Sequence, residues 1–363
     1  MTHELPENSA SERMISVDAL RGFNMLWIIG VADITYKLHE LYDHPVTAFL
    51  DKQLRHPAWD EGFTFYDLIW PLFFFLIGVV IPVSLRRHRA RGRTTAGLYL
   101  YIVKRALIIY LIGMLRSGPL SYDFLQIYWG NVLQRIAVCY LVTTILFLHT
   151  GWRLQVVINA AILLLYWAAL MLLEIDGYGP GVSSQAECWV YAFGLSDNAV
   201  TTPLSVPSVF FGVWAGQYLH SDTSGARKAA MLAIAGGALI VAASVWGIWF
   251  PMIKRIWSST YVLYAGGWSC LLLALFYWVI DVKGYRNWAF FFVVIGTNAL
   301  LIYFLIGGHT IVDFEWIAKL FLQGLLDRAG VEKARPLFLM GGALIVKWLL
   351  LWYFYRRRIF LRA

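Results

Sequence analysis

Long apolar segments alternate with short polar ones along the whole chain. Each apolar segment is roughly 18 to 23 residues long, enough for a helix to cross about 30 Å of hydrocarbon. The pattern predicts an all-α, polytopic membrane helix bundle with about ten transmembrane helices. We expect these helices at residues 16–36, 66–85, 98–115, 130–149, 154–173, 204–220, 229–250, 260–280, 288–307 and 336–355.

One further segment, residues 311–330, has a different pattern. Its apolar positions are interrupted by charged residues, namely Asp313, Glu315, Lys319 and Asp327. A helix with one apolar and one charged face lies along a membrane surface rather than through it. We therefore expect an amphipathic helix on the outer face of the bundle.

The positions of the arginines predict the orientation of the bundle. The loop 86–93 contains five arginines and no acidic residue. Loops of this kind remain in the cytoplasm. Counting spans from this loop places both termini in the cytoplasm, and the run from Arg356 to Arg358 agrees. Residues 37–65 and 174–203 then form long outer loops.

Composition strengthens the membrane interpretation. Of the 363 residues, 60% are hydrophobic and 14% are charged, an apolar excess that one soluble core cannot hide. The net charge of +8 comes from loops between spans, which indicates membrane topology rather than a nucleic-acid partner. We expect residues 1–15 to form a cytoplasmic tail without a cleavable leader, and residues 16–363 to form one membrane domain.

The motifs of common soluble enzymes are missing. The three cysteines, Cys139, Cys188 and Cys270, form no CxxC pair, so we expect neither a disulfide scaffold nor a bound metal. The sequence also has no Walker loop, no GxGxxG pattern and no HExxH pattern. Any chemistry is therefore expected between the membrane helices.

Ionisable residues inside the spans are informative, because burying a charge in lipid costs at least ~2.5–3.5 kcal/mol. Asp18 and Arg21 are three positions apart on the first span, where they can form a self-neutralised pair or contact a ligand. Arg105 and Arg135 lie in the third and fourth spans. Arg135 needs an anionic partner, either a carboxylate such as Asp67 or a phosphate- or carbonyl-bearing ligand.

Two amide side chains accompany these charges within the spans. Gln134 directly precedes Arg135, and Asn298 follows Gly296 and Thr297. A buried amide must be hydrogen-bonded. For Asn298, this requirement predicts either a contact that holds two helices together or a donor toward a ligand.

Histidine is the side chain best suited to proton transfer near neutral pH. His56 precedes Pro57, which restricts the backbone of His56 to an extended form. Trp59 follows with an aromatic face that can stack on a sugar ring, and Asp60 offers a carboxylate that can orient an imidazole. His309, at the outer end of the ninth span, is a second candidate. A solvated surface histidine is the alternative interpretation of both.

Several short motifs occur in an order and spacing that resemble the heparan-α-glucosaminide N-acetyltransferase family, including its bacterial relatives. The resemblance extends over about residues 13–360. The motifs are SVDALRGF at 16–23, HPAW at 56–59, FYDLIWP at 65–71, GNVLQRIA at 130–137 and GTN at 296–298.

This resemblance implies a multi-pass acyltransferase of a bacterial inner membrane. Acetyl-CoA would enter from the cytoplasm, and its acetyl group would pass to the amine of a terminal glucosamine or related amino sugar on the periplasmic side. The family's proposed catalytic histidine corresponds to His56 by the H-x-x-W match. Animal relatives suggest a homodimer. Where the family often has an Asn late in the first span, this sequence has Ala32 followed by Asp33.

A mechanism follows from these roles. His56 would accept a proton from the acceptor's ammonium, because only the neutral amine attacks a thioester. Asp33, Asp60 or Asp67 could hold the imidazole in the required tautomer. The thioester oxyanion needs a donor, for which we name three residues: Asn298, Gln134 and Arg135.

The remaining candidates bind the two substrates. We expect Trp59, Asp67, Asn298 and His309 on the side of the sugar. The negatively charged nucleotide end of CoA is expected near basic groups at the inner surface. These groups are the loop 86–93, Arg105, the Asp18–Arg21 pair, Gln134 and Arg135.

Three alternatives remain open at this stage. Transfer could be direct or could pass through an acetyl-histidine intermediate on His56. The acceptor could be a cell-envelope glycan other than glucosamine. The chain could instead be a permease for amino sugars or oligosaccharides, because intramembrane charges also line translocation paths.

Overall fold

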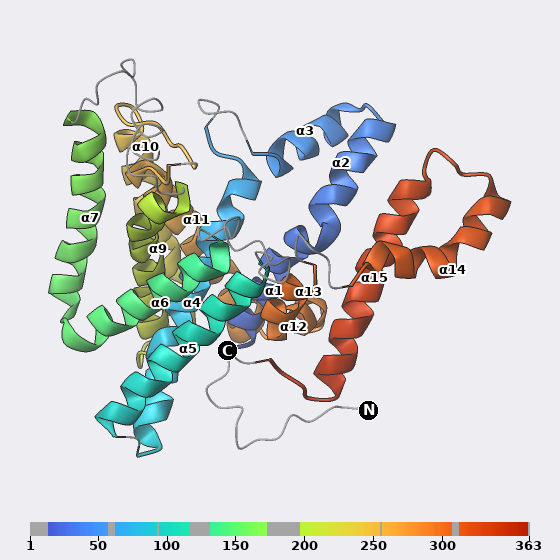
Figure 1. The fold of residues 1–363 in the computed structure, drawn as a ribbon. Helices are drawn as coiled ribbons and strands as arrows, with labels where there is room; N and C mark the ends of the chain where they lie inside the picture. The colour runs from blue at the N-terminus through green and yellow to red at the C-terminus, as the bar shows by residue number, and fades with distance from the viewer. Residues whose placement is uncertain are drawn as a thin grey trace.

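The protein is helical throughout the part that the structure describes, and no strand occurs there (Figure 1). A computed structural model describes residues 14–56, 62–92, 94–116, 131–172, 197–254, 256–306 and 312–361. The helices are α1 (Ile15–Leu26), η1 (Trp27–Val31), α2 (Ala32–Leu41), α3 (Pro45–Leu54), α4 (Phe65–Ala90), α5 (Thr95–Arg116), α6 (Val132–His149), α7 (Trp152–Leu172), α9 (Asp197–Leu219), α10 (Gly225–Trp246), α11 (Ser259–Phe276), η4 (Tyr277–Val282), α12 (Ala289–Thr297), α13 (Ala299–Leu305), α14 (Phe314–Ala329) and α15 (Arg335–Arg356).

Eight of the described helical segments are long and apolar enough to cross a membrane. They correspond to eight of the predicted spans, and α14 corresponds to the predicted amphipathic helix. The predicted spans 204–220 and 288–307 are also helical, as α9 and as the consecutive helices α12 and α13. The structure confirms the predicted fold class, a polytopic bundle of membrane helices.

The first span is longer than predicted, and the outer loop after it contains a helix. Helices α1, η1 and α2 follow one another without a gap to Leu41, beyond the predicted end at residue 36. Helix α3 occupies part of the predicted loop 37–65. Two residues fix the start of α3. Nδ1 of His44 accepts a hydrogen bond from the backbone N–H of Val46, and Pro45 occupies the first turn. The pattern of apolar residues does not reveal such a cap.

The predicted span 288–307 is wrong as a single helix, because it is interrupted at Asn298. The side chain of Asn298 donates to the carbonyl oxygen of Ile359 at 3.0 Å and accepts from the backbone N–H of Leu361 at 3.0 Å. The amide of Asn298 therefore forms hydrogen bonds with two backbone groups of the C-terminal segment, which the sequence pattern did not reveal.

Close helix packing in the bundle depends on glycine. Helices α4 and α9 approach so closely that a Cβ on Gly78 would overlap the carbonyl oxygen of Val209. A Cβ on Gly212 would likewise overlap the carbonyl oxygen of Phe75. Small residues let membrane helices bring their backbones together and gain van der Waals contact, since lipid supplies no hydrophobic driving force between helices.

Replacing Gly78 by leucine is expected to cost at least about 1–3 kcal/mol of stability, because the new side chain has no space between α4 and α9. Thermal unfolding in detergent, followed by tryptophan fluorescence or size exclusion, measures the effect. Gly237→Leu is the matched control, since a Cβ on Gly237 meets no atom within 4 Å. Equal unfolding temperatures for the two variants would contradict this account of the packing.

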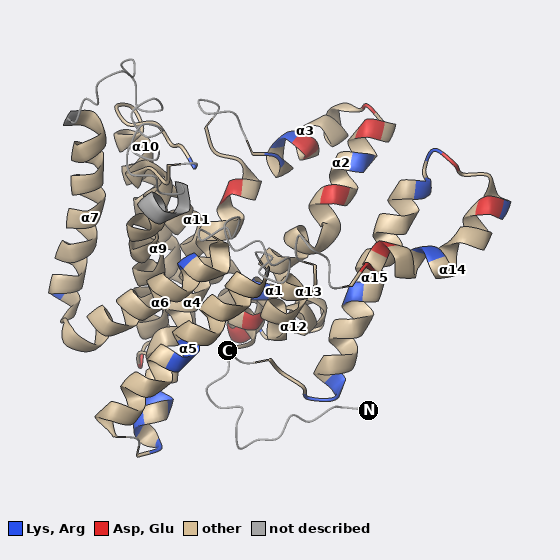
Figure 2. Cartoon of the chain, viewed as in Figure 1, with Lys and Arg blue, Asp and Glu red and all other residues tan. Residues whose placement is uncertain are grey.

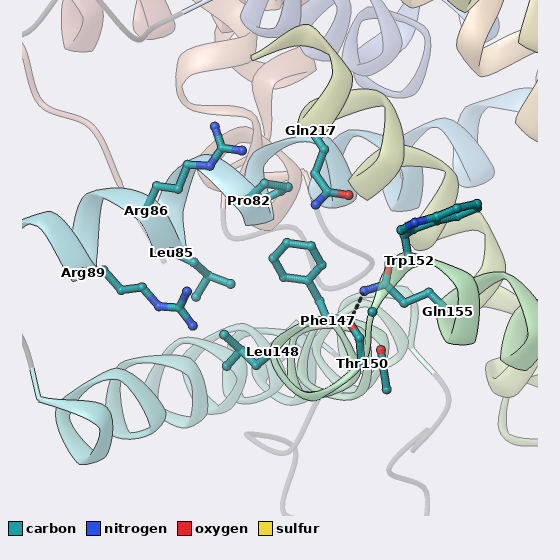
Figure 3. A pocket seen from close by; sticks show the side chains of 11 residues that line it. Pro82, Leu85, Arg86, Arg89, Phe147, Leu148, Thr150, Trp152, Gln155 and Gln217 are labelled. Carbon is teal, nitrogen blue, oxygen red and sulfur yellow. Dashed lines mark hydrogen bonds between the residues drawn. The ribbon is translucent and has the colours of Figure 1, made fainter. Parts of the chain in front are cut away.

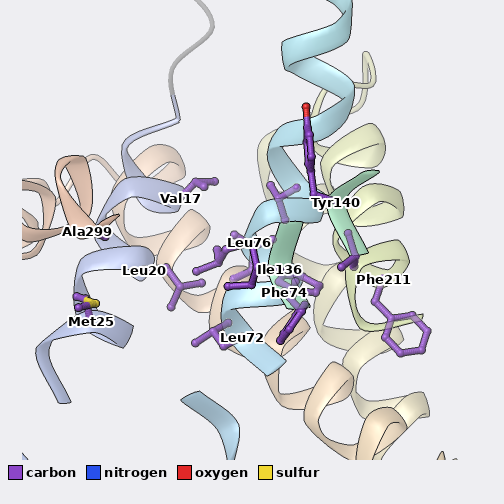
Figure 4. Close-up of a cluster of buried hydrophobic side chains, with 14 of the residues drawn as sticks. Val17, Leu20, Met25, Leu72, Phe74, Leu76, Ile136, Tyr140, Phe211 and Ala299 are labelled. Atoms are coloured by element: carbon purple, nitrogen blue, oxygen red, sulfur yellow. The ribbon is translucent and has the colours of Figure 1, made fainter. Parts of the chain in front are cut away.

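The core of the bundle lies where α1, α4, α6 and α9 meet (Figure 4). Leu20, Leu76 and Phe210 are completely buried there. In contrast, Leu100, Leu165 and Ile234 on α5, α7 and α10 are 63–70% exposed. A soluble protein rarely leaves so much aliphatic surface uncovered, whereas lipid-facing helices require it.

The two ends of the bundle carry different charges (Figure 2). At one end, where α4 begins, acidic and basic residues are mixed on α2 and α3, and Asp67 lies in the first turn of α4. At the other, where α4 ends, Lys and Arg gather on α4, α5 and the end of α15. We call the first the histidine end, because it holds His56, and the second the arginine end.

Candidate active site

A buried carboxylate at the start of α4 organises the histidine end. Asp67 is 1% exposed and is the third residue of α4. One oxygen, Oδ2, accepts from the backbone N–H of Thr64 and from its hydroxyl, both at 3.2 Å. These capping bonds and the positive end of the helix dipole hold a negative charge at this position.

His56 contacts the other carboxylate oxygen. Its Nδ1 lies 3.0 Å from Oδ1 of Asp67. The segment before it is held in place because the hydroxyl of Thr64 donates to the carbonyl oxygen of Arg55 at 2.9 Å. The ring of Tyr66 lies beside the imidazole, with centroids 5.0 Å apart.

The tautomer of His56 follows from this contact. A carboxylate only accepts hydrogen bonds, so Nδ1 carries the proton and Nε2 keeps its lone pair. The imidazole side chain is 49% exposed, whereas its carboxylate partner is buried. His56 therefore presents a basic nitrogen at the surface of the histidine end, with a carboxylate behind it that stabilises the protonated ring.

A lysine completes the cluster. Nζ of Lys254 lies 2.8 Å from Nδ1 and 3.1 Å from Nε2 of His56, and 3.3 Å from Oδ1 of Asp67. Lys254 belongs to the turn between α10 and α11, 198 positions from His56. An ammonium only donates, so the lysine can donate to the carboxylate and to whichever ring nitrogen of His56 carries no proton, which is Nε2 in the tautomer that the Asp67 contact requires.

Burial changes the acidity of this lysine. The side chain of Lys254 is 19% exposed. Loss of hydration lowers the pKa of its ammonium from the usual 10.5 to about 8, although Asp67 acts in the opposite direction. A much larger fraction of Lys254 is consequently neutral near pH 8 than of an ordinary surface lysine.

A second layer connects the cluster to the interior. The hydroxyl of Tyr261 donates to the backbone carbonyl of Asp67 at 2.7 Å. The ring of Tyr261 packs against Trp257, and the guanidinium of Arg135 lies 3.9 Å from the centroid of Trp257. Nε of Arg135 donates to the hydroxyl of Ser205 at 2.7 Å. Arg135 thus lies beneath the site and stacks on an aromatic ring.

Several other predicted residues have described contacts that lie elsewhere. Asp33, on α2, is an electrostatic neighbour of Tyr66 and of Lys347, and no described hydrogen bond joins it to His56. Asp18 and Arg21 pair with each other at 3.2 Å, as their spacing predicted. The side chain of Asn298 forms hydrogen bonds with the backbone of Ile359 and Leu361.

Among the predicted site residues that the structure describes, two have a buried side-chain nitrogen without a hydrogen-bond partner. The two nitrogens are Nε2 of Gln134 and Nε of Arg105. Oε1 of Gln134 accepts from the backbone N–H of Asn131, and the guanidinium of Arg105 lies 4.9 Å from the centroid of Tyr140. These donors can serve a polar ligand that enters between the helices.

A cavity of about 350 Å³ opens at the arginine end, between α4, α9 and the junction of α6 with α7 (Figure 3). Arg86 and Arg89 line one side of it, and Gln155 and Gln217 line the opposite side. Arg86 lies 19 positions after Asp67 on α4, which corresponds to about 28 Å along the helix axis. The cavity therefore lies far from His56.

Three predicted site residues, Trp59, Asp60 and His309, lie outside the described residues. Lys254, by contrast, is well described and was not among the predicted residues. A signal for it existed: Lys254 and Arg255 occupy a short loop that the span count places outside, where the charge rule disfavours basic residues. A basic pair at such a position has a local partner or a function.

Fold and site together define a polytopic helical membrane protein with a His–Asp–Lys cluster at one end of the bundle. No family model matches the chain. It is 27% identical over 339 residues to heparan-alpha-glucosaminide N-acetyltransferase of Mus musculus and 25% identical over 345 residues to that of Homo sapiens. These alignments cover 72% and 73% of the chain and 50% of each relative.

The chain is therefore a distant relative of the heparan-alpha-glucosaminide N-acetyltransferases, and the resemblance predicted from its motifs is confirmed. It spans about half the length of the curated relatives that it matches.

Proposed function

We propose that this protein is a membrane acetyltransferase that moves an acetyl group from acetyl-CoA to the amine of a terminal glucosamine or a related amino sugar. The observation that carries the proposal is the contact between His56 Nδ1 and the buried Asp67, which directs the lone pair of the ring to Nε2, beside the ammonium of Lys254. The distant relatives are named as N-acetyltransferases of a glucosaminide, which supports the same reaction class.

In this reaction, Nε2 of His56 removes a proton from the acceptor's ammonium. Asp67 stabilises the imidazolium that results. The neutral amine attacks the thioester carbonyl, the C–S bond breaks, and the CoA thiolate takes the proton that His56 holds. The second proton lost by the nitrogen as the amide forms goes to water. Arg135 and Nε2 of Gln134 are the candidate donors for the oxyanion, because both lie in the buried layer of the bundle.

The charge distribution supports a transmembrane arrangement. We propose that the arginine end faces the cytoplasm and the histidine end faces the periplasm of a bacterial inner membrane, following the positive-inside rule. Arg86 and Arg89, at the cavity of the arginine end, supply guanidinium groups of the kind that bind the phosphates of a nucleotide. CoA carries its thioester at the end of a long arm. A CoA molecule whose nucleotide binds at the arginine end can therefore extend its thioester toward the histidine end.

Release of CoA thiol tests the proposal. Purified protein in detergent, given acetyl-CoA and glucosamine, is expected to release thiol in proportion to the N-acetylglucosamine formed. A permease would release none, but would move labelled amino sugar into proteoliposomes. Uptake without thiol release would therefore overturn the proposal in favour of transport.

A further inference from the structure

The ammonium of Lys254 occupies the position that an acceptor amine needs. It lies beside the imidazole of His56, 2.8 Å from Nδ1 and 3.1 Å from Nε2, and 3.3 Å from Oδ1 of Asp67. An incoming sugar ammonium would require these same two groups, one to take its proton and one to balance its charge. The structure therefore already holds one amine against the base.

The turn that carries Lys254 is firmly held. The hydroxyl of Ser258 accepts from the backbone N–H of Ile253 at 3.0 Å, and the hydroxyl of Thr260 donates to the carbonyl oxygen of Pro251 at 3.0 Å. Phe250 is completely buried at the start of the turn. Lys254 is consequently held at His56 by its own backbone, and its long side chain needs no rearrangement to reach the ring.

We propose that Lys254 is itself an acetylation site, which the chain modifies on Nζ when an acetyl donor reaches His56 and Asp67. With acetyl-CoA as the donor, this inference rests on the proposed function. The lowered pKa of Lys254, about 8, supports it, because roughly a hundredfold more of this amine is neutral at pH 8 than of an ordinary lysine.

The chemistry balances without a further reactant. The Lys254 ammonium gives one proton to Nε2 of His56, and the freed lone pair forms a C–N bond with the acetyl carbonyl carbon. The C–S bond breaks, and the thiolate takes the proton from His56. The second proton lost as the amide forms goes to water. Acetylated Lys254 carries no charge, so it no longer balances Asp67, and it fills the space beside the base.

Mass spectrometry of the whole purified chain tests the inference. The protein is incubated at pH 8 with acetyl-CoA or, separately, with the small ester p-nitrophenyl acetate, and acetylation is quantified for each lysine-containing peptide. Lys52 on α3 is the internal reference, because it is exposed and lies at the same end of the bundle. Lys254 is expected to be acetylated about tenfold or more faster than Lys52.

The variants distinguish an activated amine from an exposed one. His56→Ala should reduce acetylation of Lys254 by about tenfold or more relative to the unmodified chain, and Lys254→Arg should remove the modified peptide. The rate at Lys254 should rise with pH through about 8, since the neutral amine is the nucleophile. Labelling of Lys254 no faster than Lys52 with both donors, or undiminished in His56→Ala, would overturn the inference.

The ester separates this inference from the proposed function. Rapid, His56-dependent labelling by the ester, together with no reaction of acetyl-CoA, supports the inference and contradicts the proposed donor. Acetyl transfer from acetyl-CoA to glucosamine without any modification of Lys254 overturns the inference and leaves the proposed function intact.

Discussion

Replacing His56 by alanine is expected to lower acetyl transfer from acetyl-CoA by about 10²–10⁴-fold. The variant removes the only described imidazole that contacts Asp67, and with it the base that converts the acceptor's ammonium into a nucleophile. The measurement is the rate of CoA thiol release with glucosamine as acceptor, in protein purified to the same monodispersity as the unmodified chain.

A matched control is available on the same end of the bundle. His39→Ala removes a half-buried imidazole whose described contact is the hydroxyl of Thr47, at 3.3 Å. It is expected to leave the rate within about a factor of two, as for surface substitutions of small energetic effect. Retention of transfer in His56→Ala would show that the base has been assigned to the wrong residue.

Replacing Asp67 by asparagine is expected to reduce the catalytic rate by about 10²-fold or more, with a smaller effect on the KM for acetyl-CoA. The amide side chain can still accept from Thr64, so α4 keeps its cap, but it carries no charge to stabilise the imidazolium. It can also donate toward Nδ1 and so favour the opposite tautomer, in which Nε2 is no longer a base.

A control variant and the unfolding temperatures complete this test. Asp43→Asn, at an exposed position of the histidine end, should have no comparable effect. Unfolding temperatures of both variants show whether a loss of rate comes from a loss of structure. An Asp67→Asn protein that is folded and fully active would contradict the assignment of Asp67 as the partner of His56.

Much of the fold followed from the chain's apolar periodicity. The long spans are recognisable because lipid requires an uninterrupted apolar surface on each helix. The errors have local causes. Helix α3 begins at a His44–Pro45 cap within a mostly polar segment, and the span at 288–307 is interrupted where Asn298 bonds the C-terminal segment. Neither feature changes hydropathy enough to be detected by a pattern of apolar residues.

The site was predicted less completely than the fold. His56 was identified from its motif, and Asp67 was among the carboxylates expected to orient it. Lys254 was missed, because it is 198 positions away and has no recognisable spacing to either residue. Only the packing of the α10–α11 turn against the first turn of α4 brings its ammonium to the imidazole.

The sequence by itself determined the membrane class and most of the spans, because these depend on composition and period alone. The tertiary structure decided which groups touch His56. It placed Asp67 against the imidazole, through a helix cap that fixes the carboxylate's direction. It also added Lys254, since contacts between distant segments depend on how helices pack, and helix packing leaves no periodic signal in one sequence.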